Sequence, residues 1–496
     1  MQRGVPMTFP WLSLLIFLPL AGIPLCALLH RSPQACRVVT LALTGASFII
    51  SLKLFLAYRH ASGWMLQEDA AWIDRFGIRY TLGLDGLSLL MVLLSAFLMI
   101  IAVLVSWRAV TKHVPLFHAL LLLLQSGIMG VFLALDLVLF YLFWEVMLIP
   151  MFFLIGIWGH GRRLYAAVKF FLFTLAGSLL MLVALIVLYL QHGEQSGIYT
   201  FALEALQQTT LALPLQTLLF AAFFLAFAIK VPLVPVHTWL PDAHTEAPTA
   251  GSVILAGLLL KTGVYGLVRF AFPLFPEATA ASLPLLAFLA LAGIFYAAWI
   301  AYRQEDAKRL VAYSSVAHLG FIILGLAAWN VTAIEGALLQ MVNHGITTGA
   351  LFALVGMIDE RAHTRQLSGL GGLWSRVPVL SACFLFFNLA SLGLPGLNNF
   401  TGEILILIGT FKSAPLWGTI AACGVVFAAA YTLRLVQGVI WGEAKGEEPW
   451  PDLTLREGLI LAPLAVLVVW LGLYPATFLE PLAAPVAQLL ATGGMP

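Results

Sequence analysis

The sequence predicts an all-α polytopic membrane protein with about 14 transmembrane helices. Of its 496 residues, 61% are hydrophobic and only 10% are charged, and the mean hydropathy is +0.99, whereas about a quarter of the residues in a soluble domain are charged. Apolar runs long enough to cross a bilayer recur along the whole chain. None of these runs alternates polar and apolar residues as the strands of a membrane β-barrel do. The balance of 25 basic against 23 acidic residues leaves no electrostatic footprint for nucleic acid.

Fourteen apolar spans are separated by polar residues. The first resembles a signal peptide, but it lacks a small-residue cleavage site and is interpreted as a retained helix. The approximate limits of the spans are 10–29, 38–57, 84–106, 114–134, 137–158, 164–190, 213–236, 249–271, 283–302, 310–328, 333–357, 379–411, 416–441 and 457–477.

The Lys and Arg residues of the loops orient the spans. Fourteen lie in loops that follow odd-numbered spans and six lie on the other side, if Arg269 is counted with the loop after the eighth span. Loops rich in Lys and Arg stay inside, so both termini are expected on the exterior side. The remaining basic residues fall within spans and are Lys53, Lys169, Lys230, Lys261 and Arg434.

Two spans are expected to be broken. The seventh reads "AIKVPLVPVHTWLP", in which three prolines remove backbone donors from the helix. The twelfth reads "SLGLPGLNNFTGEIL", in which Pro395, Gly396 and two asparagines interrupt the helix at mid-span. Broken helices at membrane depth, one in each half of a chain, indicate a transport site between inverted repeats.

The spacing of charged residues supports two related halves. Adding 173 to the positions of Glu145, Lys230 and Lys261 gives His318, Glu403 and Arg434, whereas Lys169 gives Val342, two residues before His344. Spans four to eight and nine to thirteen are therefore predicted to be five-helix repeats, inverted because each holds an odd number of spans. The predicted divisions are residues 1–113 (helices 1 to 3 and an exterior hairpin loop), 114–271 (first repeat), 283–441 (second repeat) and 457–496 (helix 14 and an exterior tail).

Two exterior segments have their own predicted structure. The loop 58–83 contains "FGIRYTLGLDG", whose alternation and turn residues indicate a surface hairpin. The tail after residue 478 has the composition of a short amphipathic helix.

Six residues within the spans can each gain or lose a proton. A chain of such groups is what proton passage through a membrane requires, and burial brings the proton affinities of acids and amines toward each other. Lysine suits a relay, because arginine hardly deprotonates. These candidates for proton translocation are Glu145, Lys230, Lys261, His318, His344 and Glu403, with His237, Arg434 and Lys169 as secondary candidates.

Each candidate also has a structural alternative. The acid and the lysines could hold helices together as buried ion pairs. Lys169 could extend to the interface from a helix end, and the histidines could pack against the Ser, Thr and Asn residues beside them. Arg434 fits a fixed anchor better than a proton carrier.

No other chemistry is indicated. The four cysteines lie at 26, 36, 383 and 423, without the spacing of a disulfide framework, a zinc site or an iron–sulfur site. Histidines paired for haem and a glycine loop for nucleotides are also missing from the sequence. The sequence therefore predicts no cofactor or metal on this chain.

Four segments carry a family resemblance: "FYLFWEVMLIPMFFLIGIWG", "FAIKVPLVPVHTWLPDAHTEAPTAGSVILAGLLLKTGVYGLVRF", "QEDAKRLVAYSSVAHLGF" and "SLGLPGLNNFTGEILIL". They resemble the antiporter-like membrane subunits of proton-pumping NADH:quinone oxidoreductase, respiratory complex I, over spans three to fourteen. Glu403, where the sister subunits usually carry lysine, and a chain that ends soon after span fourteen favour the middle one of three sisters.

The resemblance implies a site and an assembly. Glu145 and Lys230 would form a coupled pair, Lys261 the central relay, and Glu403 the group near the exit half-channel. The partners would be other complex I membrane subunits, especially the sister subunits L and N, in a bacterial inner membrane. FMN, iron–sulfur clusters, NADH and quinone would be bound by other subunits.

Two alternatives stay open at this stage. Subunits of multi-subunit cation/proton antiporters and of membrane-bound hydrogenases share most of these motifs. A scaffold that positions partner subunits without carrying protons is the third interpretation.

Overall fold

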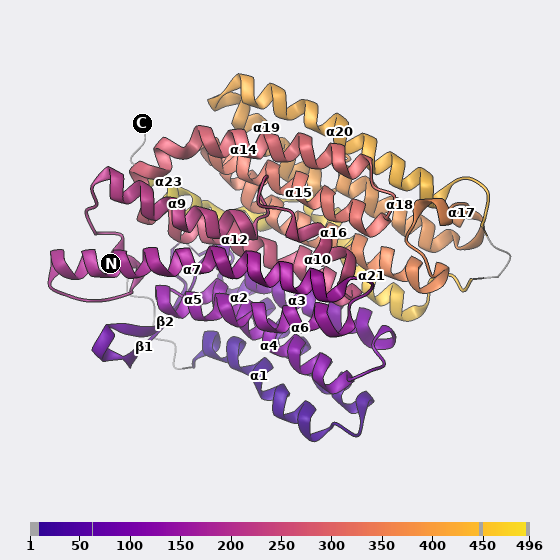
Figure 1. Ribbon diagram of the computed structural model, residues 1–496, viewed down its shortest axis with the longest axis horizontal. Helices are drawn as coiled ribbons and strands as arrows, with labels where there is room; N and C mark the ends of the chain where they lie inside the picture. Colours follow the sequence, from indigo (N-terminus) through magenta and orange to yellow (C-terminus); the bar gives the residue numbers. More distant parts are fainter. Residues whose placement is uncertain (1–8, 62, 446–449, 493–496) are drawn as a thin grey trace.

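The computed structural model describes residues 9–61, 63–445 and 450–492, and these form one bundle of long helices (Figure 1). Proline begins several of them, where its missing N–H costs nothing. The membrane-crossing helices of the first half are α1 (Trp11–Leu28), α2 (Pro33–Tyr58), α3 (Gly86–Ala109), α4 (Val114–Leu133), α5 (Leu137–Val146) continued by α6 (Leu148–Trp158), α7 (Arg163–Ser196) and α9 (Leu213–Lys230).

The remaining membrane-crossing helices follow along the chain. They are the run Thr249–Leu274, then α14 (Pro276–Tyr302), α15 (Ala307–Ala327), α16 (Val331–Ala362), α18 (Pro378–Leu392), α19 (Asn398–Ser413), α20 (Pro415–Ile440) and α21 (Leu455–Leu473). Thirteen helices among the described residues are long and apolar enough to cross a membrane, and α18 with α19 supplies the predicted twelfth span in two pieces, which brings the total to fourteen. The predicted all-α polytopic fold is confirmed.

Both predicted breaks are present. α9 ends at Lys230, and the chain turns before α10 (Trp239–Glu246). α18 ends at Leu392, and Gly393 and Gly396 take positive φ values of 85° and 90° before α19 begins. Glycine adopts this conformation without the steric cost that other residues incur, so these two glycines locate the second break.

Two further irregularities were not predicted. The fifth span is interrupted at Met147, between α5 and α6, where Pro150 cannot donate a backbone hydrogen bond to the preceding turn. The run Thr249–Leu274 consists of α11 (Thr249–Ile254), the π-helical turns η2 (Leu255–Leu259) and η3 (Leu267–Ala271), α12 (Leu260–Gly266) between them, and α13 (Phe272–Leu274).

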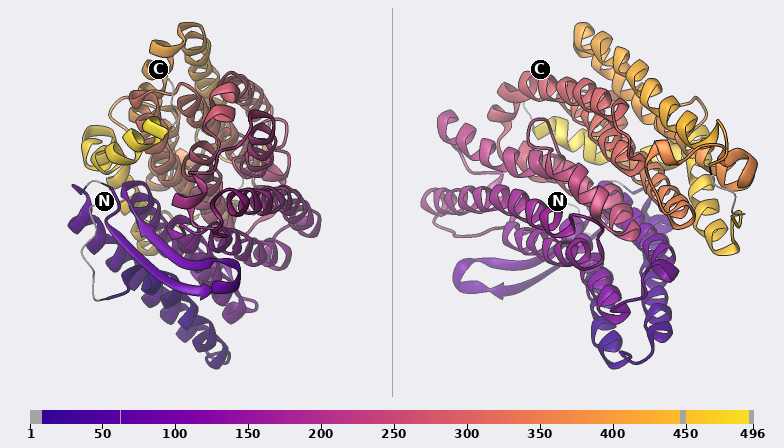
Figure 2. Two further views of the ribbon diagram at one scale, coloured as in Figure 1. Left: turned by 90° about the vertical axis from the view of Figure 1, so that its left-hand side faces the viewer. Right: turned by 45° about the vertical axis from the view of Figure 1, so that its right-hand side comes forward.

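The predicted surface hairpin is confirmed. β1 (Leu66–Ile73) and β2 (Ile78–Leu84) pair antiparallel around the 3₁₀ turn η1 (Asp74–Phe76), and they project from one end of the bundle (Figure 2). We name this the hairpin end. The predicted C-terminal helix is also present, as α22 (Ala476–Leu479), η5 (Glu480–Leu482) and α23 (Ala483–Thr492), with α23 packed on α3 and α16.

Asp136 joins the hairpin to the bundle. Its carboxylate accepts the N–H groups of Val138 and Leu139 as the N-cap of α5, and it also accepts the N–H of Arg79 in β2. Burial raises the pKa of Asp136, and these backbone hydrogen bonds oppose the shift. The short helix α8 (Leu203–Leu206) lies at the same end and pairs with the chain next to Asp136.

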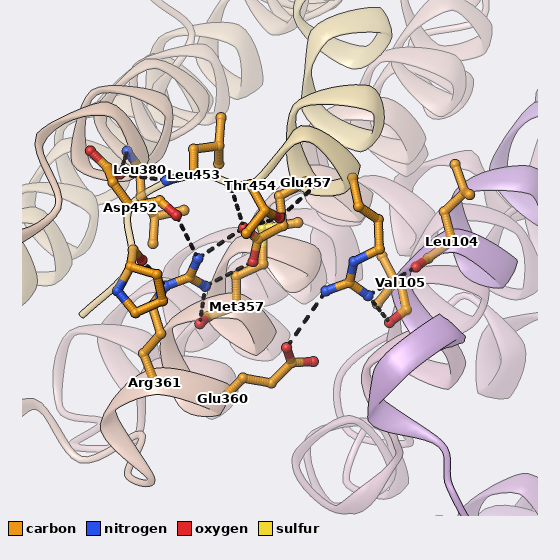
Figure 3. A network of polar contacts seen from close by, with 12 residues as sticks. Leu104, Val105, Met357, Glu360, Arg361, Leu380, Asp452, Leu453, Thr454 and Glu457 are labelled. Carbon is orange, nitrogen blue, oxygen red and sulfur yellow. Dashed lines mark hydrogen bonds and ion pairs between the residues drawn. The ribbon is translucent and has the colours of Figure 1, made fainter.

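A network of polar contacts joins the loop before α21 and the first turn of α21 to other helices (Figure 3). Arg361, near the end of α16, donates to both carboxylate oxygens of Glu457 at 2.8 Å and to the Asp452 carbonyl. The Asp452 carboxylate accepts the first N–H groups of α18, and Arg456 reaches Glu360 and two carbonyls of α3. The ends of α3, α16, α18 and α21 are thereby fixed relative to one another, with the loop elements η4 (Leu367–Gly369) and α17 (Leu373–Arg376) nearby.

The expectation that Arg269 lies in a loop is wrong. Arg269 is within η3, it is 9% exposed, and it pairs with Asp85.

Two cysteines whose spacing in the sequence fits no metal site lie close together in the structure. Cys26 and Cys36 are buried between α1 and α2, with their sulfur atoms 2.7 Å apart.

Candidate functional site

Lys261 and His344 form the centre of the site. Lys261 lies in α12, between the two π-helical turns, and its Nζ is 2.6 Å from Nδ1 of His344 in α16. Both side chains are fully buried. Lys261 also donates to the carbonyl of Ala256, which lies in the π turn η2. π-helical turns inside α-helices often mark functional sites, and here the turn supplies a carbonyl to the buried ammonium group.

His318 and Glu403 form a second contact. Nδ1 of His318, in α15, is 2.8 Å from Oε1 of Glu403, in α19, and Gln340 donates to the same oxygen at 3.2 Å. On the other side of the ring, Nε2 of His318 faces the hydroxyl groups of Tyr431 at 3.2 Å and Ser391 at 3.4 Å. Both ring nitrogens of His318 therefore have neighbours that can donate or accept.

The second helix break makes room for Glu403. A Cβ atom on Gly393 would lie 3.1 Å from Oε2 of the carboxylate, so only glycine allows this approach without a shift. Asn398, the first residue of α19, and Asn343 in α16 each donate a side-chain amide N–H to the backbone carbonyl of the other. Thr347 adds a third bond to the Asn398 side chain at 3.0 Å. These bonds fix the start of the broken helix against the helix that carries His344.

The two contacts lie next to each other. The rings of His318 and His344 have centroids 5.8 Å apart and are tilted by 59°. Lys261, His344, His318 and Glu403 therefore form one buried series from α12 through α16 and α15 to α19, which we name the central series. These four residues were predicted individually from the sequence, and the structure brings them together.

Lys230 and Glu145 are placed differently. Lys230 is fully buried at the C-terminal end of α9, where a helix dipole favours a cation. Its Nζ has no hydrogen-bond partner among the described residues and lies 5.1 Å and 5.6 Å from the ring centroids of Trp144 and Phe170. Glu145 is only half-buried and its buried Oε1 is also unpartnered in the described chain. The structure places the two residues on adjacent elements without an ion pair.

Two of the three secondary candidates form ion pairs. Lys169 pairs with Asp242 at 2.8 Å, and Arg309 approaches the other oxygen of Asp242 at 3.5 Å. Arg434 pairs with Glu305 at 2.5 Å and donates to the Tyr302 carbonyl, which is the anchor position expected for it.

His237 is buried in the first break. Its ring meets the edges of Tyr296 and Tyr313, and its Nδ1 has no partner among the described residues. The contacts are those of a packed side chain that keeps one polar atom available.

His244 is a buried histidine that was not among the residues predicted from the sequence. This residue is fully buried in α10 and stacks on Phe352 of α16, with centroids 4.5 Å apart and rings parallel to within 1°. Both of its ring nitrogens are unpartnered in the described part of the chain. The sequence held a signal for this residue, because only two histidines lie between Lys230 and Lys261. They are His237 in "PVH" and His244 in "WLPDAH".

The arrangement defines a class of protein. A helical membrane bundle with two broken helices and a buried series of lysine, histidine and glutamate has the construction of proton- and ion-transporting membrane subunits. Every member of the central series is a proton donor or acceptor, and neighbouring members are within hydrogen-bond or ring-contact distance.

Comparison with known proteins identifies the family. Residues 134–428 match the family described as "NADH:quinone oxidoreductase/Mrp antiporter, TM". The chain is 47% identical over 493 residues to NADH-quinone oxidoreductase subunit M of Pseudomonas aeruginosa, and 44% identical over 490 residues to the subunit of that name from Escherichia coli K12, with 96% of each chain covered in both cases.

A solved structure agrees with this result. A chain of respiratory complex I from Thermus thermophilus with bound NADH matches with a TM-score of 0.87 and 36% sequence identity, over 97% of this chain and 99% of that chain. The chain therefore belongs to the NADH:quinone oxidoreductase/Mrp antiporter family of membrane proteins.

Proposed function

We propose that this chain is a proton-translocating membrane-arm subunit of an NADH:quinone oxidoreductase. The observation that carries the proposal is the central series: four buried titratable side chains in consecutive contact through the middle of the bundle. Buried ionisable groups are expensive in a membrane and are usually functional. The relatives named NADH-quinone oxidoreductase subunit M supply the reaction that the series would serve.

In this proposal the chain moves protons and its partners provide the energy. Glu145 and Lys230 respond to neighbouring subunits, Lys261 with His344 relays, and Glu403 exchanges protons with the exit half-channel. Electron transfer through FMN, iron–sulfur clusters and quinone takes place on other subunits, and this chain carries no redox chemistry. The proposed partners include the sister antiporter-like subunits L and N.

The predicted repeats and orientation are part of the proposal. The halves at 114–271 and 283–441 would be inverted copies, and both termini would face the periplasm of a bacterial inner membrane. The described ends of the chain are consistent with one side for both, because α1 begins and α23 lies at the hairpin end (Figure 1).

Glu403 provides the test. Glu403→Asp keeps a titratable carboxylate, whereas Glu403→Gln keeps size and polarity and can still accept from His318 and Gln340, but it cannot release a proton. We expect Glu403→Asp to keep substantial proton pumping and Glu403→Gln to lose most of it. Glu403→Lys should retain more activity than the Gln form, because lysine titrates. Glu194→Gln, at an exposed glutamate near the end of α7, is the matched control.

The measurement is NADH-driven proton uptake by reconstituted vesicles, with assembly of each variant checked by the subunit content of the purified complex. Quinone reduction is followed in the same samples. Equal pumping by the Gln and Asp forms would remove Glu403 from the proton path. Sodium transport in place of proton uptake would favour the antiporter interpretation.

A further inference from the structure

A second polar cluster lies on the helix that carries Lys261, toward the hairpin end. Tyr265 and Arg269 follow Lys261 at intervals of four residues, so they occupy nearly the same side of the helix, with Arg269 about 12 Å along the axis from Lys261. Nη2 of Arg269 is 2.5 Å from Oδ2 of Asp85, the N-cap of α3, and both side chains are buried. The central series does not include this cluster.

The hydroxyl group of Tyr265 is fully engaged. It donates to the carbonyl of Phe132 in α4 at 2.9 Å and accepts from Nε of Arg269 at 3.2 Å, and the hydroxyl of Ser88 lies 3.0 Å away. The hydroxyl proton that Tyr265 donates to a main-chain carbonyl has no titratable acceptor there. Tyr265 is therefore the end of this chain of hydrogen bonds.

Arg269 is the member of this cluster that faces the aqueous side. It lines a small cavity of about 60 Å³ at the hairpin end, together with Trp64, Glu204, Gln207 and Gln488. The side chains of Glu204 and Gln488 are exposed, so the cavity reaches the surface. Its volume accommodates about two water molecules at about 30 Å³ each. Arg269 also lies over the ring of Trp64, with its Cζ atom 4.9 Å from the ring centroid.

We propose that the Asp85–Arg269–Tyr265 cluster is a fixed seal that keeps protons from returning from the hairpin-end cavity to Lys261. A guanidinium group hardly releases its proton, so Arg269 cannot relay one. Its permanent positive charge at a constriction repels hydronium, as arginine does in pores that exclude protons. Asp85 offsets the cost of burying that charge. The seal rests on the proposed function, because it protects the relay at Lys261.

Passive proton permeability tests the seal. The assembled complex is reconstituted without NADH, a potassium diffusion potential is applied with valinomycin, and proton entry is followed with an internal pH dye. The double variant Asp85→Asn/Arg269→Gln should leak protons several-fold faster than the wild type, with NADH-driven quinone reduction retained. Asp69→Asn/Arg79→Gln removes an exposed ion pair of the hairpin and is the matched control; it should leak like the wild type.

Two single variants separate a charge barrier from a packing defect. Asp85→Asn keeps the guanidinium, so its leak should remain at the wild-type level; a leak equal to that of the double variant would indicate packing alone and overturn the proposal. Arg269→Lys preserves a cation for assembly but can deprotonate, so its leak should exceed that of the wild type. A wild-type leak in every assembled variant that lacks the guanidinium would also overturn the seal.

The outcome is independent of pumping through the central series. Passive leak requires no turnover, whereas the Glu403 variants report on turnover. If Glu403→Gln pumped normally while Asp85→Asn/Arg269→Gln leaked, Glu403 would be removed from the proton path and the seal would stand.

Discussion

Lys230 and Lys261 allow a direct comparison of two buried lysines with different surroundings. Both are fully buried, but Lys261 contacts His344 and the Ala256 carbonyl, whereas Nζ of Lys230 has no hydrogen-bond partner among the described residues. Lys→Met nearly conserves volume and removes the charge. The two substitutions therefore isolate the contribution of the contacts around the ammonium group.

The expected changes have opposite signs. A buried unsatisfied donor costs about 1–3 kcal/mol, and more if it is charged. Cation–π contacts with the rings of Trp144 and Phe170 offset about 0.5–2 kcal/mol of this cost at Lys230. Lys230→Met should therefore stabilise the subunit by about 1–2 kcal/mol. Lys261→Met leaves the His344 nitrogen and a carbonyl unpaired in the core, and it should destabilise by about 1–3 kcal/mol.

Thermal release of this subunit from the purified complex, followed on native gels, is the assay. A difference of 2–5 kcal/mol between the two variants corresponds to a separation of roughly several degrees. NADH-driven proton uptake should be lost in both variants. At Lys230 the native lysine would then be required for function although it lowers stability. A Lys230→Met complex that releases the subunit at a lower temperature than the wild type would refute the reasoning.

Three further outcomes follow from the contacts. Glu145→Gln should reduce both electron transfer and pumping strongly if the charge at that position is switched, and near-normal pumping by the assembled variant would decide for a packing role. Arg361→Met leaves the Glu457 carboxylate buried without its partner, so it should destabilise by about 3–5 kcal/mol, and adding Glu457→Gln should restore part of the melting temperature of the complex. A side-chain hydrogen bond from Arg79 lowers the pKa of Asp69, so the hairpin should lose this small stabilisation as the pH falls through that lowered value. This loss should appear as lower hydrogen-exchange protection factors in β1 and β2, and unchanged protection factors would exclude it.

The sequence was sufficient for the fold because membrane crossing has a strong local signal. A helix must be apolar over about 20 residues, and prolines and glycines mark the places where it cannot continue. The two breaks, the hairpin and the C-terminal helix could therefore be placed from residue types alone. Glu403 could be recognised for the same reason, because a carboxylate beside "LPGLNNF" has no ordinary explanation in an apolar span.

Contacts between helices left weaker signals. The separation of 85 residues between His318 and Glu403 says nothing about their contact, which depends on how α15 and α19 pack. The π-helical turns beside Lys261 have no distinct residue type, because Leu, Ala and Gly suit an α-helix equally well. Arg269 was misplaced because an arginine near the end of a span normally marks the interface, whereas here Asp85 allows the guanidinium to stay inside the bundle.

The two halves of the chain differ in how they hold their buried charges. The offset of 173 relates Glu145 and Lys230 to His318 and Glu403, but only the second pair is in contact. A buried ionisable group without a partner is the more costly arrangement, so we expect Lys230 to be held at a higher free-energy cost than His318 or Glu403. The stability of Lys230→Met and the pumping of Glu403→Gln measure the two sides of this asymmetry.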